Sequence, residues 1–303
     1  WGRPSMPIPR RAVMLLASAL LLPLPAVAGP VLERIAETGT LRLGFRTDAP
    51  PFAALAAGRP EGFSIDLCAR VAEAVRETGG LERLTARFEP VGTGQRFEVL
   101  VAGEIDVLCG ATTATLSRRE TVSFSLPIFL TGVAAVMRAD APELAREVLL
   151  EASPAAFSET VVRTALSGMR FGVRRDTTAE AWLAGTAPVA DGLAEVEPFA
   201  THEAGIEAVR AGEIDAYFAD RAILAGQLRA ETGPDGLAVS EKTFTHEPYA
   251  LALPRGDEDF RLVIDRALSR LYRTGEVTAL FERHFGAPPA EVRAFYRRTA
   301  LPE

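Results

Sequence analysis

Two charged side chains, Arg118 and Asp220, each follow a short apolar run of the chain. Arg118 ends the segment "CGATTATLSR" and offers a planar guanidinium that matches a carboxylate with two parallel hydrogen bonds. Thr113, in a run of hydroxyl side chains before it, adds donors for an anion. Asp220 ends "DAYFAD" and offers a carboxylate to an ammonium group. Together these groups would hold the two charged ends of an α-amino acid, whereas singly each would be an ordinary surface charge.

Five further polar residues occupy comparable positions. Arg46 ends the strand-like run "LRLGFR", and Thr177 stands at the start of a predicted helix. Thr93 and His202 each lie ten residues before a glycine at which a predicted helix stops. Arg96 falls in the first turn of its helix, where a cation opposes the helix dipole, so an anionic partner is indicated. The alternative is that Arg46 and Arg96 are solvated surface charges.

A repeated pentapeptide shows which elements position these side chains. The letters "AGEID" occur at 102–106 and again at 211–215, each time after a helix-like run and before an apolar strand-like run. The glycine suits the residue after a helix, because glycine adopts left-handed backbone freely. Each copy therefore predicts a helix end and a strand start in one of two similar α/β units. Ligands of open α/β sheets bind beyond the carboxyl ends of strands, so we expect the two strand ends to face one another across a cleft.

The remaining pattern alternates between strands and helices, which predicts mostly parallel sheets flanked by helices. We expect a helix over 64–77 with Ser64 as its N-cap, and a helical, solvent-facing insertion over 142–164. The predicted strands are 41–46, 105–111, 133–138, 170–173, 214–220 and 249–254, and the other predicted helices are 95–102, 202–211 and an amphipathic run beginning near 260.

The N-terminal segment has the composition of an export signal. Two arginines precede an 11-residue apolar run and the small-residue site Ala26–Ala28, which predicts a signal peptide over 1–28 that is cleaved after Ala28. We therefore expect an exported protein. The chain has a formal charge of −7. Removing the three arginines of the segment takes −7 to −10, and a chain this acidic is not expected to bind nucleic acid or an anionic membrane.

The sequence lacks the motifs of familiar catalytic and metal sites. It contains neither G-x-S-x-G, nor a phosphate-binding loop, nor G-x-G-x-x-G, and its three histidines have no metal-ligand spacing. We therefore expect a binding protein without a metal or cofactor. Its two cysteines, Cys68 and Cys109, are either a disulfide or two small buried hydrophobic residues. Both alternatives stay open, because a disulfide requires a Cα distance that the sequence does not give.

Several segments in order resemble the periplasmic amino-acid-binding proteins of ABC importers, known as solute-binding family 3. They include "LRLGFRTDAPPFA", "EGFSIDLC", "GVRRDTTAE" and "AGEIDAYFADRAILAG", and the resemblance runs from about Leu41 to Pro289. "CGATT", "GQRF" and the histidine at the helix start are similar to the glutamate/aspartate-binding branch. The chain departs from the pattern at Asp176, where the family usually has glycine, and in its longer insertion over 142–164.

The resemblance implies a two-lobed periplasmic-binding-protein fold of type II that closes as a hinge. Lobe 1 would comprise 29–129 and 251–303, and lobe 2 would comprise 130–250. A monomeric receptor would deliver the amino acid to an inner-membrane ABC permease. The resemblance also implies roles for nine residues: Arg118, Thr113 and Thr177 for the α-carboxylate, Asp220 and the carbonyl of Ala111 for the α-ammonium, and Arg46, Thr93, Arg96 and His202 for the side-chain carboxylate.

Three other functions remain open at this point. In the first alternative, the protein is a receptor for another polar amino acid, such as glutamine or asparagine. The same fold is used by cyclohexadienyl dehydratases, which are enzymes acting on arogenate or prephenate. The chain would also serve as the ligand domain of a sensor, with a separate membrane partner.

Overall fold

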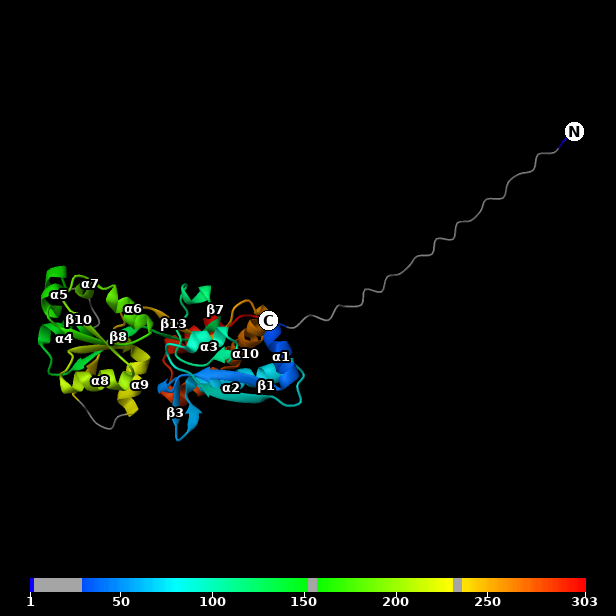
Figure 1. Cartoon of the computed structure of the whole chain (residues 1–303), viewed down its shortest axis with the longest axis horizontal. Helices are drawn as coiled ribbons and strands as arrows, with labels where there is room; N and C mark the ends of the chain where they lie inside the picture. Colours follow the sequence, from blue (N-terminus) through cyan, green and yellow to red (C-terminus); the bar gives the residue numbers. More distant parts are fainter. Residues whose placement is uncertain (3–28, 152–156, 231–235) are drawn as a thin grey trace.

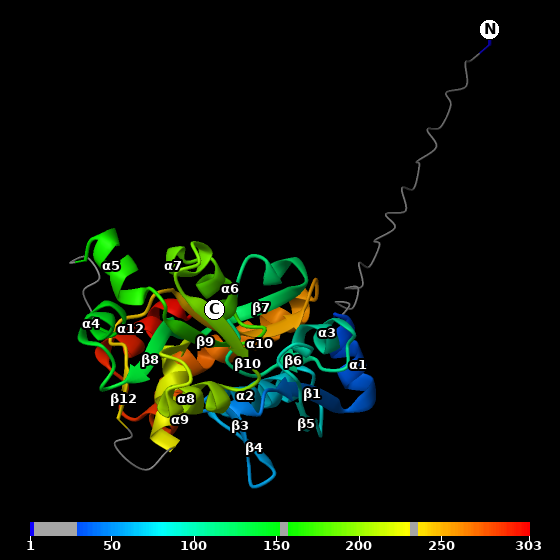
Figure 2. The same ribbon diagram turned by 60° about the vertical axis from the view of Figure 1, so that its left-hand side comes forward.

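The computed structural model describes residues 1–2, 29–151, 157–230 and 236–303 (Figure 1). Nearly all of the predicted signal peptide, residues 3–28, lies outside the described residues. The described chain forms two α/β lobes that lie side by side, with β13 between them in the view of Figure 1. In Figure 2 the lobe on the left of Figure 1 comes forward and overlaps the other lobe in the view.

The helices are α1 (Pro30–Thr38), α2 (Phe63–Thr78), α3 (Arg96–Val101), α4 (Glu143–Leu150), α5 (Glu159–Leu166), α6 (Thr178–Ala184), α7 (Ala187–Ala190), α8 (His202–Ala211), α9 (Arg221–Ala230), α10 (Glu258–Thr274), α11 (Glu276–Phe285) and α12 (Ala290–Thr299), with a 3₁₀ turn, η1 (Arg118–Glu120). The strands are β1 (Thr40–Phe45), β2 (Asp48–Ala49), β3 (Ala53–Ala56), β4 (Arg59–Glu61), β5 (Thr85–Pro90), β6 (Val107–Leu108), β7 (Val122–Thr131), β8 (Val133–Arg138), β9 (Arg170–Arg174), β10 (Glu195–Phe199), β11 (Ala216–Asp220), β12 (Leu237–Val239) and β13 (Glu247–Pro254).

Two five-stranded sheets share one plan. The first has the order β5-β1-β6-β13-β7 and the second the order β10-β9-β11-β8-β12. In each sheet the first three strands are parallel to one another. The fourth strand pairs antiparallel with the third, and the fifth pairs antiparallel with the fourth. A small antiparallel sheet, β2-β3-β4, is attached to the first unit. The sequence pattern correctly predicted two similar α/β units. The prediction of mostly parallel sheets was wrong, because two of the four strand pairings in each sheet are antiparallel.

The repeated pentapeptide has the same structure in both units. Gly103 and Gly212 follow helices α3 and α8 with φ angles of 70° and 74°, in the left-handed region that glycine enters without strain. The aspartates that close the two copies make matching bonds. Asp106 accepts from a backbone N–H of β1 at 2.7 Å, and Asp215 accepts from a backbone N–H of β9 at 2.7 Å. The prediction that each copy ends a helix and begins a strand is confirmed.

The isoleucine of each copy explains a glycine in the neighbouring strand. A Cβ atom on Gly44 would lie 2.3 Å from Cδ1 of Ile105, and one on Gly172 would lie 2.4 Å from Cδ1 of Ile214. Both isoleucines are buried. Each glycine therefore makes room for an isoleucine that anchors the next strand, so the two units share this packing as well as their topology.

The chain crosses between the two sheets twice. It passes from β7 to β8 at Gly132, and it returns through the segment between β12 and β13. The crossing segments are bonded to each other, since the N–H of Val133 donates to Oγ1 of Thr245 at 2.9 Å. We keep the name lobe 1 for residues 29–129 and 251–303, and lobe 2 for 130–250. The boundaries at 129/130 and 250/251 stay predictions, and they fall within β7 and β13.

Two local predictions were wrong. Ser64 is inside α2 rather than its N-cap, because the chain enters the helix at Gly62 with a φ angle of 131°. A Cβ there would lie 2.3 Å from the carbonyl oxygen of Phe52, so glycine alone fits. The described parts of the 142–164 insertion contain helices α4 and α5, as predicted, but α4 is not merely solvent-facing. Its apolar face, including Val148 and Leu149, is buried in the core of lobe 2.

A disulfide joins Cys68 of α2 to Cys109, just after β6, with a Cα–Cα distance of 6.2 Å. Both residues are fully buried in the core of lobe 1. The structure therefore decides between the two alternatives that the sequence left open. The bond also ties helix α2 to the strand end that leads into the segment carrying Ala111 and Thr113.

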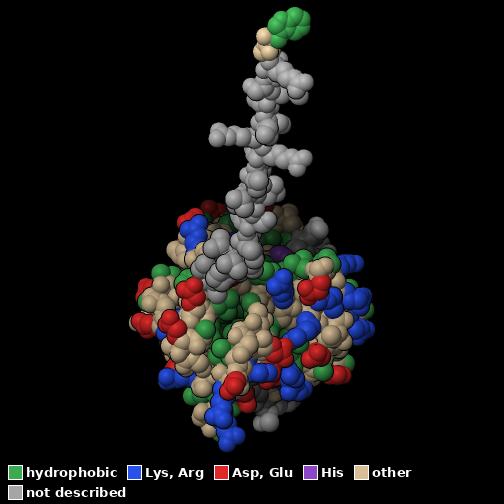
Figure 3. Space-filling model, turned by 90° about the vertical axis from the view of Figure 1, so that its right-hand side faces the viewer, with side chains coloured by type: hydrophobic (Ala, Val, Ile, Leu, Met, Phe, Trp, Pro, Cys, Tyr) green, Lys and Arg blue, Asp and Glu red, His purple; other side chains and the backbone are tan. Residues whose placement is uncertain are grey.

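The surface of lobe 1 carries acidic and basic side chains interspersed with one another (Figure 3). Among the residues that the structure describes, no helix combines the length and apolarity needed to cross a bilayer.

Candidate functional site

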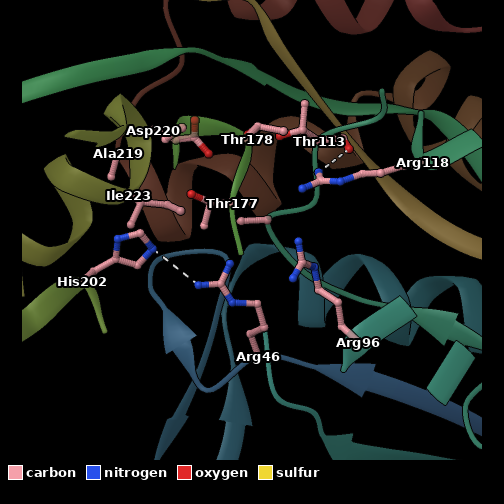
Figure 4. A pocket seen from close by; sticks show the side chains of 12 residues that line it. Arg46, Arg96, Thr113, Arg118, Thr177, Thr178, His202, Ala219, Asp220 and Ile223 are labelled. Carbon is pink, nitrogen blue, oxygen red and sulfur yellow. Dashed lines mark hydrogen bonds between the residues drawn. The ribbon is translucent and has the colours of Figure 1, made fainter. Parts of the chain in front are cut away.

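A pocket lies between the two lobes, where strand ends and helix starts of both units meet. The lining residues are Arg46, Arg96, Ala111, Thr113 and Arg118 from lobe 1, and Thr177, Thr178, Ala179, His202, Ala219, Asp220 and Ile223 from lobe 2. Figure 4 shows the guanidinium groups of Arg46, Arg96 and Arg118 converging on the space that faces the carboxylate of Asp220. The pocket therefore presents cations from one lobe and a carboxylate from the other.

The structure brings eight of the nine predicted site residues to this pocket, and Thr93 is the exception. Helix α3 begins at Arg96, three residues later than the predicted equivalence with His202 required. Thr93 is buried, and its hydroxyl oxygen accepts a hydrogen bond from Nη2 of Arg174 at 2.6 Å. Its side chain thus contacts a protein group next to the pocket. The binding roles of the nine residues stay predictions.

Arg96 and Arg118 have carbonyl oxygens as their hydrogen-bond acceptors. Arg96 donates to the carbonyls of Thr93 and, at 3.1 Å, of Asp176, while Arg118 donates to the carbonyl of Thr113 at 2.8 Å. In the described part of the chain, neither guanidinium forms an ion pair with a carboxylate. Burial, followed by repulsion from Arg118 and other arginines, lowers the pKa of Arg96 to about 9. An unpaired, desolvated cation of this kind is stabilised by an anion.

Both cations also contact one aromatic ring. The guanidinium carbon of Arg96 lies 4.6 Å from the ring centroid of Phe97, and that of Arg118 lies 5.2 Å from it. The electron-rich face of an aromatic ring attracts a cation. Phe97 therefore supports the two arginines that have no carboxylate partner.

Arg46 and His202 meet across the pocket. Nη2 of Arg46 donates to Nε2 of His202 at 3.4 Å, and Nδ1 of His202 lies 3.0 Å from the hydroxyl of Tyr217. Burial and the charge of Arg46 lower the pKa of His202 to about 3, so the imidazole is neutral. Since a guanidinium can only donate, Nε2 is the acceptor, and Nδ1 carries the proton and donates to Tyr217. His202 therefore adds no positive charge to the pocket.

Asp220 is the carboxylate that faces these cations. Its Oδ2 accepts a hydrogen bond from the hydroxyl of Tyr249, whereas its Oδ1 is enclosed and has no partner among the described residues. Burial raises the pKa of Asp220 to about 7, and the charge of Glu247 adds to the rise. A buried carboxylate oxygen without a donor is costly, so a donor from a ligand would be stabilising there.

The two hydroxyl-bearing segments near the pocket differ in how far they match the sequence prediction. The segment 112–117 begins no α-helix, since only the 3₁₀ turn η1 follows it, and Oγ1 of Thr115 accepts from the N–H of Arg118 at 3.1 Å. Thr177 does cap helix α6, accepting from the N–H of Glu180 at 3.2 Å. Asp176 has a φ angle of 62°, the left-handed geometry that glycine usually supplies and that aspartate tolerates.

Sequence reasoning missed residues behind the pocket wall. Arg174 and Asp48 form an ion pair with an N–O distance of 2.5 Å, and Asp48 also pairs with Arg46 at 3.0 Å. Arg174 ends a strand, as Asp220 does, and this position could have marked it. Tyr249 is inside β13, and the sequence gives no signal that its hydroxyl reaches Asp220.

This two-lobed arrangement, with its pocket at the strand ends of both units, has a counterpart in a protein family. Residues 41–287 match the family model described as bacterial extracellular solute-binding proteins, family 3. The chain belongs to this family. Its fold is the type II periplasmic-binding-protein fold, as the resemblance had implied.

Individual family 3 proteins are similar over most of the chain. An L-glutamate/L-aspartate-binding protein of Pseudomonas aeruginosa is 30% identical over 288 residues, covering 92% of this chain and 89% of that protein. The L-cystine-binding protein TcyJ of Escherichia coli is 26% identical, covering 85% and 86%. The crystal structure of AncCDT-1, an ancestral amino acid-binding protein and precursor of cyclohexadienyl dehydratase, superposes with a TM-score of 0.69 at 23% identity, covering 85% and 100%. The last likeness concerns the fold alone.

Proposed function

We propose that this solute-binding protein captures an acidic amino acid, glutamate or aspartate, in the periplasm and delivers it to an inner-membrane ABC permease. The observation that carries the proposal is the charge pattern of the pocket. Two guanidinium groups, Arg96 and Arg118, have no carboxylate partner in the described chain, and one carboxylate oxygen, Oδ1 of Asp220, has no donor. The complement of two cations and one anion is a ligand with two carboxylates and one ammonium group, as in glutamate and aspartate.

Other features support this assignment. Arg46 contacts the carboxylate of Asp48, which Arg174 also contacts, so the pocket arginines without a carboxylate partner in the described chain are Arg96 and Arg118. In the proposed complex, Arg118 holds the α-carboxylate, Asp220 the ammonium group, and Arg96 with Arg46 the side-chain carboxylate. The relative from Pseudomonas aeruginosa is named for the same two ligands. The chain is proposed to bind its ligand without transforming it.

A thermal-shift screen with isosteric ligand pairs tests the proposal. Glutamate and glutamine have nearly the same shape but differ by one charge, as do aspartate and asparagine. A ligand at 100 times its Kd adds ~2.7 kcal/mol to the free energy of unfolding, so the acidic members should raise the melting temperature more than their amides. Equal or larger shifts with glutamine, asparagine or cystine would contradict an acidic ligand. Incubation with prephenate or arogenate should yield no product, whereas product formation would show an enzyme.

The pKa of Asp220 leads to a pH dependence of binding. The ammonium group of the ligand pairs with the ionised carboxylate. Asp220 has a pKa of about 7, because burial and the charge of Glu247 outweigh the hydrogen bond from Tyr249 and the charges of Arg46 and Arg118. Below that pH the carboxyl group of Asp220 is mostly protonated and cannot pair with the ammonium group. Glutamate affinity should therefore fall about tenfold between pH 8 and pH 6. Titration calorimetry at several pH values measures this, with proton release on binding near pH 7. A flat affinity from pH 5.5 to pH 8 would show that Asp220 does not hold the ammonium group.

A further inference from the structure

Asp48 and Arg174 connect the two lobes through an ion pair that does not line the pocket. Asp48 belongs to β2 of lobe 1, and Arg174 is the last residue of β9 in lobe 2. Oδ2 of Asp48 accepts from Nε of Arg174 at 2.8 Å and lies 2.5 Å from Nη2. The same Nη2 donates to Oγ1 of Thr93, in lobe 1, at 2.6 Å. Arg174 is buried, so this pair is largely shielded from solvent.

The segment that follows Asp48 also contacts lobe 2. Nε2 of Gln227, in α9, approaches the carbonyl oxygen of Asp48 at 3.4 Å. One residue earlier in α9, a Cβ on Gly226 would lie 2.4 Å from Cδ of Pro51 and 2.6 Å from the carbonyl oxygen of Pro50. The glycine is thus required for this close approach of the two lobes. A single short segment of lobe 1, residues 48–51, therefore meets both β9 and α9.

The electrostatics show that the Asp48 carboxylate is ionised and engaged on both sides. Burial alone would raise the pKa of Asp48, but Arg46 and Arg174 outweigh it, and the net result is a lowered pKa. Its Oδ1 accepts from Nε of Arg46 at 3.0 Å, so Asp48 holds one pocket arginine while it pairs with an arginine of the other lobe. Arg174, in turn, fixes Thr93, whose carbonyl accepts from Arg96. The pair therefore positions two pocket residues from behind.

We propose that Asp48 and Arg174 are positioning residues that form an interlobe bridge and supply part of the free energy of lobe closure from the protein itself. The bridge joins protein groups only, so its contribution is the same for every ligand. A binding site that needs the closed state has an apparent Kd equal to the intrinsic Kd divided by the closed fraction. Weakening the bridge lowers that fraction, and the affinity for all ligands falls together. A residue that contacts the ligand side chain would instead change the ranking of ligands.

The decisive measurement is the interlobe distance without ligand, which does not depend on the proposed function. Nitroxide labels at Glu82 and Glu197, exposed on lobes 1 and 2, report this distance after refolding from denaturant has removed bound ligand. We expect a closed population in the wild type that decreases in Asp48→Asn and in Arg174→Gln. The double variant should have the same closed population as each single variant, because all three lack the same ion pair. Identical distance distributions in the wild type and all three variants would overturn the proposal.

The affinity measurement rests on the proposed function and has its own controls. In Arg174→Gln, glutamate, aspartate and any neutral amino acid that binds should all lose affinity by about the same factor, about tenfold, through faster dissociation. Loss confined to acidic ligands would mean that Arg174 acts through Thr93 and Arg96 and not through lobe closure, and the bridge would be rejected. Arg174→Lys keeps the charge and should restore part of the closed population. Gly226→Ala changes no charge, but its Cβ would clash with Pro51 where the two lobes meet. This variant should therefore lower the closed population even if a charge variant folds poorly.

Discussion

Replacing Arg118 with methionine should weaken the binding of every amino acid by roughly 30-fold to several thousand-fold. Arg118 is proposed to hold the α-carboxylate, which all amino acids share, and its only protein acceptor in the described chain is the carbonyl of Thr113. Loss of one member of a desolvated, hydrogen-bonded charge pair costs ~2–5 kcal/mol, and each ~1.4 kcal/mol is a factor of ten in Kd. Burial lowers the pKa of Arg118, as expected for a cation that gains from an anionic ligand.

Arg96→Met provides the matched comparison. It should reduce glutamate affinity on the same scale but affect a neutral amino acid much less, because a neutral side chain places no charge beside Arg96. Arg119 is the control, since it is an exposed arginine next to Arg118, and Arg119→Met should stay within about threefold of wild type. Calorimetry with glutamate and glutamine measures four variants: Arg118→Met, Arg96→Met, Arg46→Met and the control Arg119→Met. If Arg96→Met and Arg46→Met both bind glutamate within about threefold of wild type, the acidic-ligand assignment is wrong.

Asp220→Asn should change binding and stability in opposite directions. The variant loses the partner of the ammonium group, so affinity for every amino acid should fall by ~2–5 kcal/mol, or roughly 30-fold or more. In the ligand-free protein the pKa of Asp220 is raised to about 7 from 3.8, chiefly by burial. Its stabilising contribution is therefore present below pH 3.8 and is lost as the pH rises through about 7. At pH 8 the ionised form costs ~4 kcal/mol at 1.36 kcal/mol per pH unit.

An amide at position 220 removes that charge but is buried itself, so the gain in unfolding free energy should be smaller, about 1–3 kcal/mol at pH 8. Urea unfolding at pH 8 and pH 5 measures the gain, which should shrink at the lower pH because the wild-type carboxyl is then protonated. Asp259→Asn, an exposed position, is the control for both properties. Wild-type glutamate affinity in Asp220→Asn would remove Asp220 from the site.

The sequence predicted the pocket well because strand ends and helix starts are local features. Arg46 and Asp220 follow apolar runs, and parallel strands place their carboxyl ends at a shared edge. The repeated pentapeptide located both edges, and its glycines have the expected left-handed backbone. These inferences required only the period of the hydrophobic pattern and the chemistry of a helix end. The fold assignment relied in addition on the family resemblance.

The unpredicted features depend on contacts between distant parts of the chain. Asp48 and Arg174 are 126 residues apart, and they meet only because the two lobes lie against each other. The same encounter directs the hydroxyl of Thr93 to Arg174 instead of the pocket. The burial of α4 was missed for a different reason, since its apolar spacing was readable but its length suggested a surface insertion. Propensity and spacing give each element, whereas the partners of its side chains follow from the assembled lobes.

The ring of Phe97 also limits how far apart the guanidinium groups of Arg96 and Arg118 can be. Their guanidinium carbons lie 4.6 Å and 5.2 Å from its centroid, so they cannot be separated by more than 9.8 Å, the sum of the two distances. At an effective dielectric constant of 20, two like charges at that separation repel by about 1.7 kcal/mol, and by more if they are closer. The ring of Phe97 therefore sets an upper limit on the distance between the two guanidinium groups. The separation of the two guanidinium groups is the span that the proposed dicarboxylate ligand would bridge, and a ligand of matching length would relieve the repulsion between the two arginines.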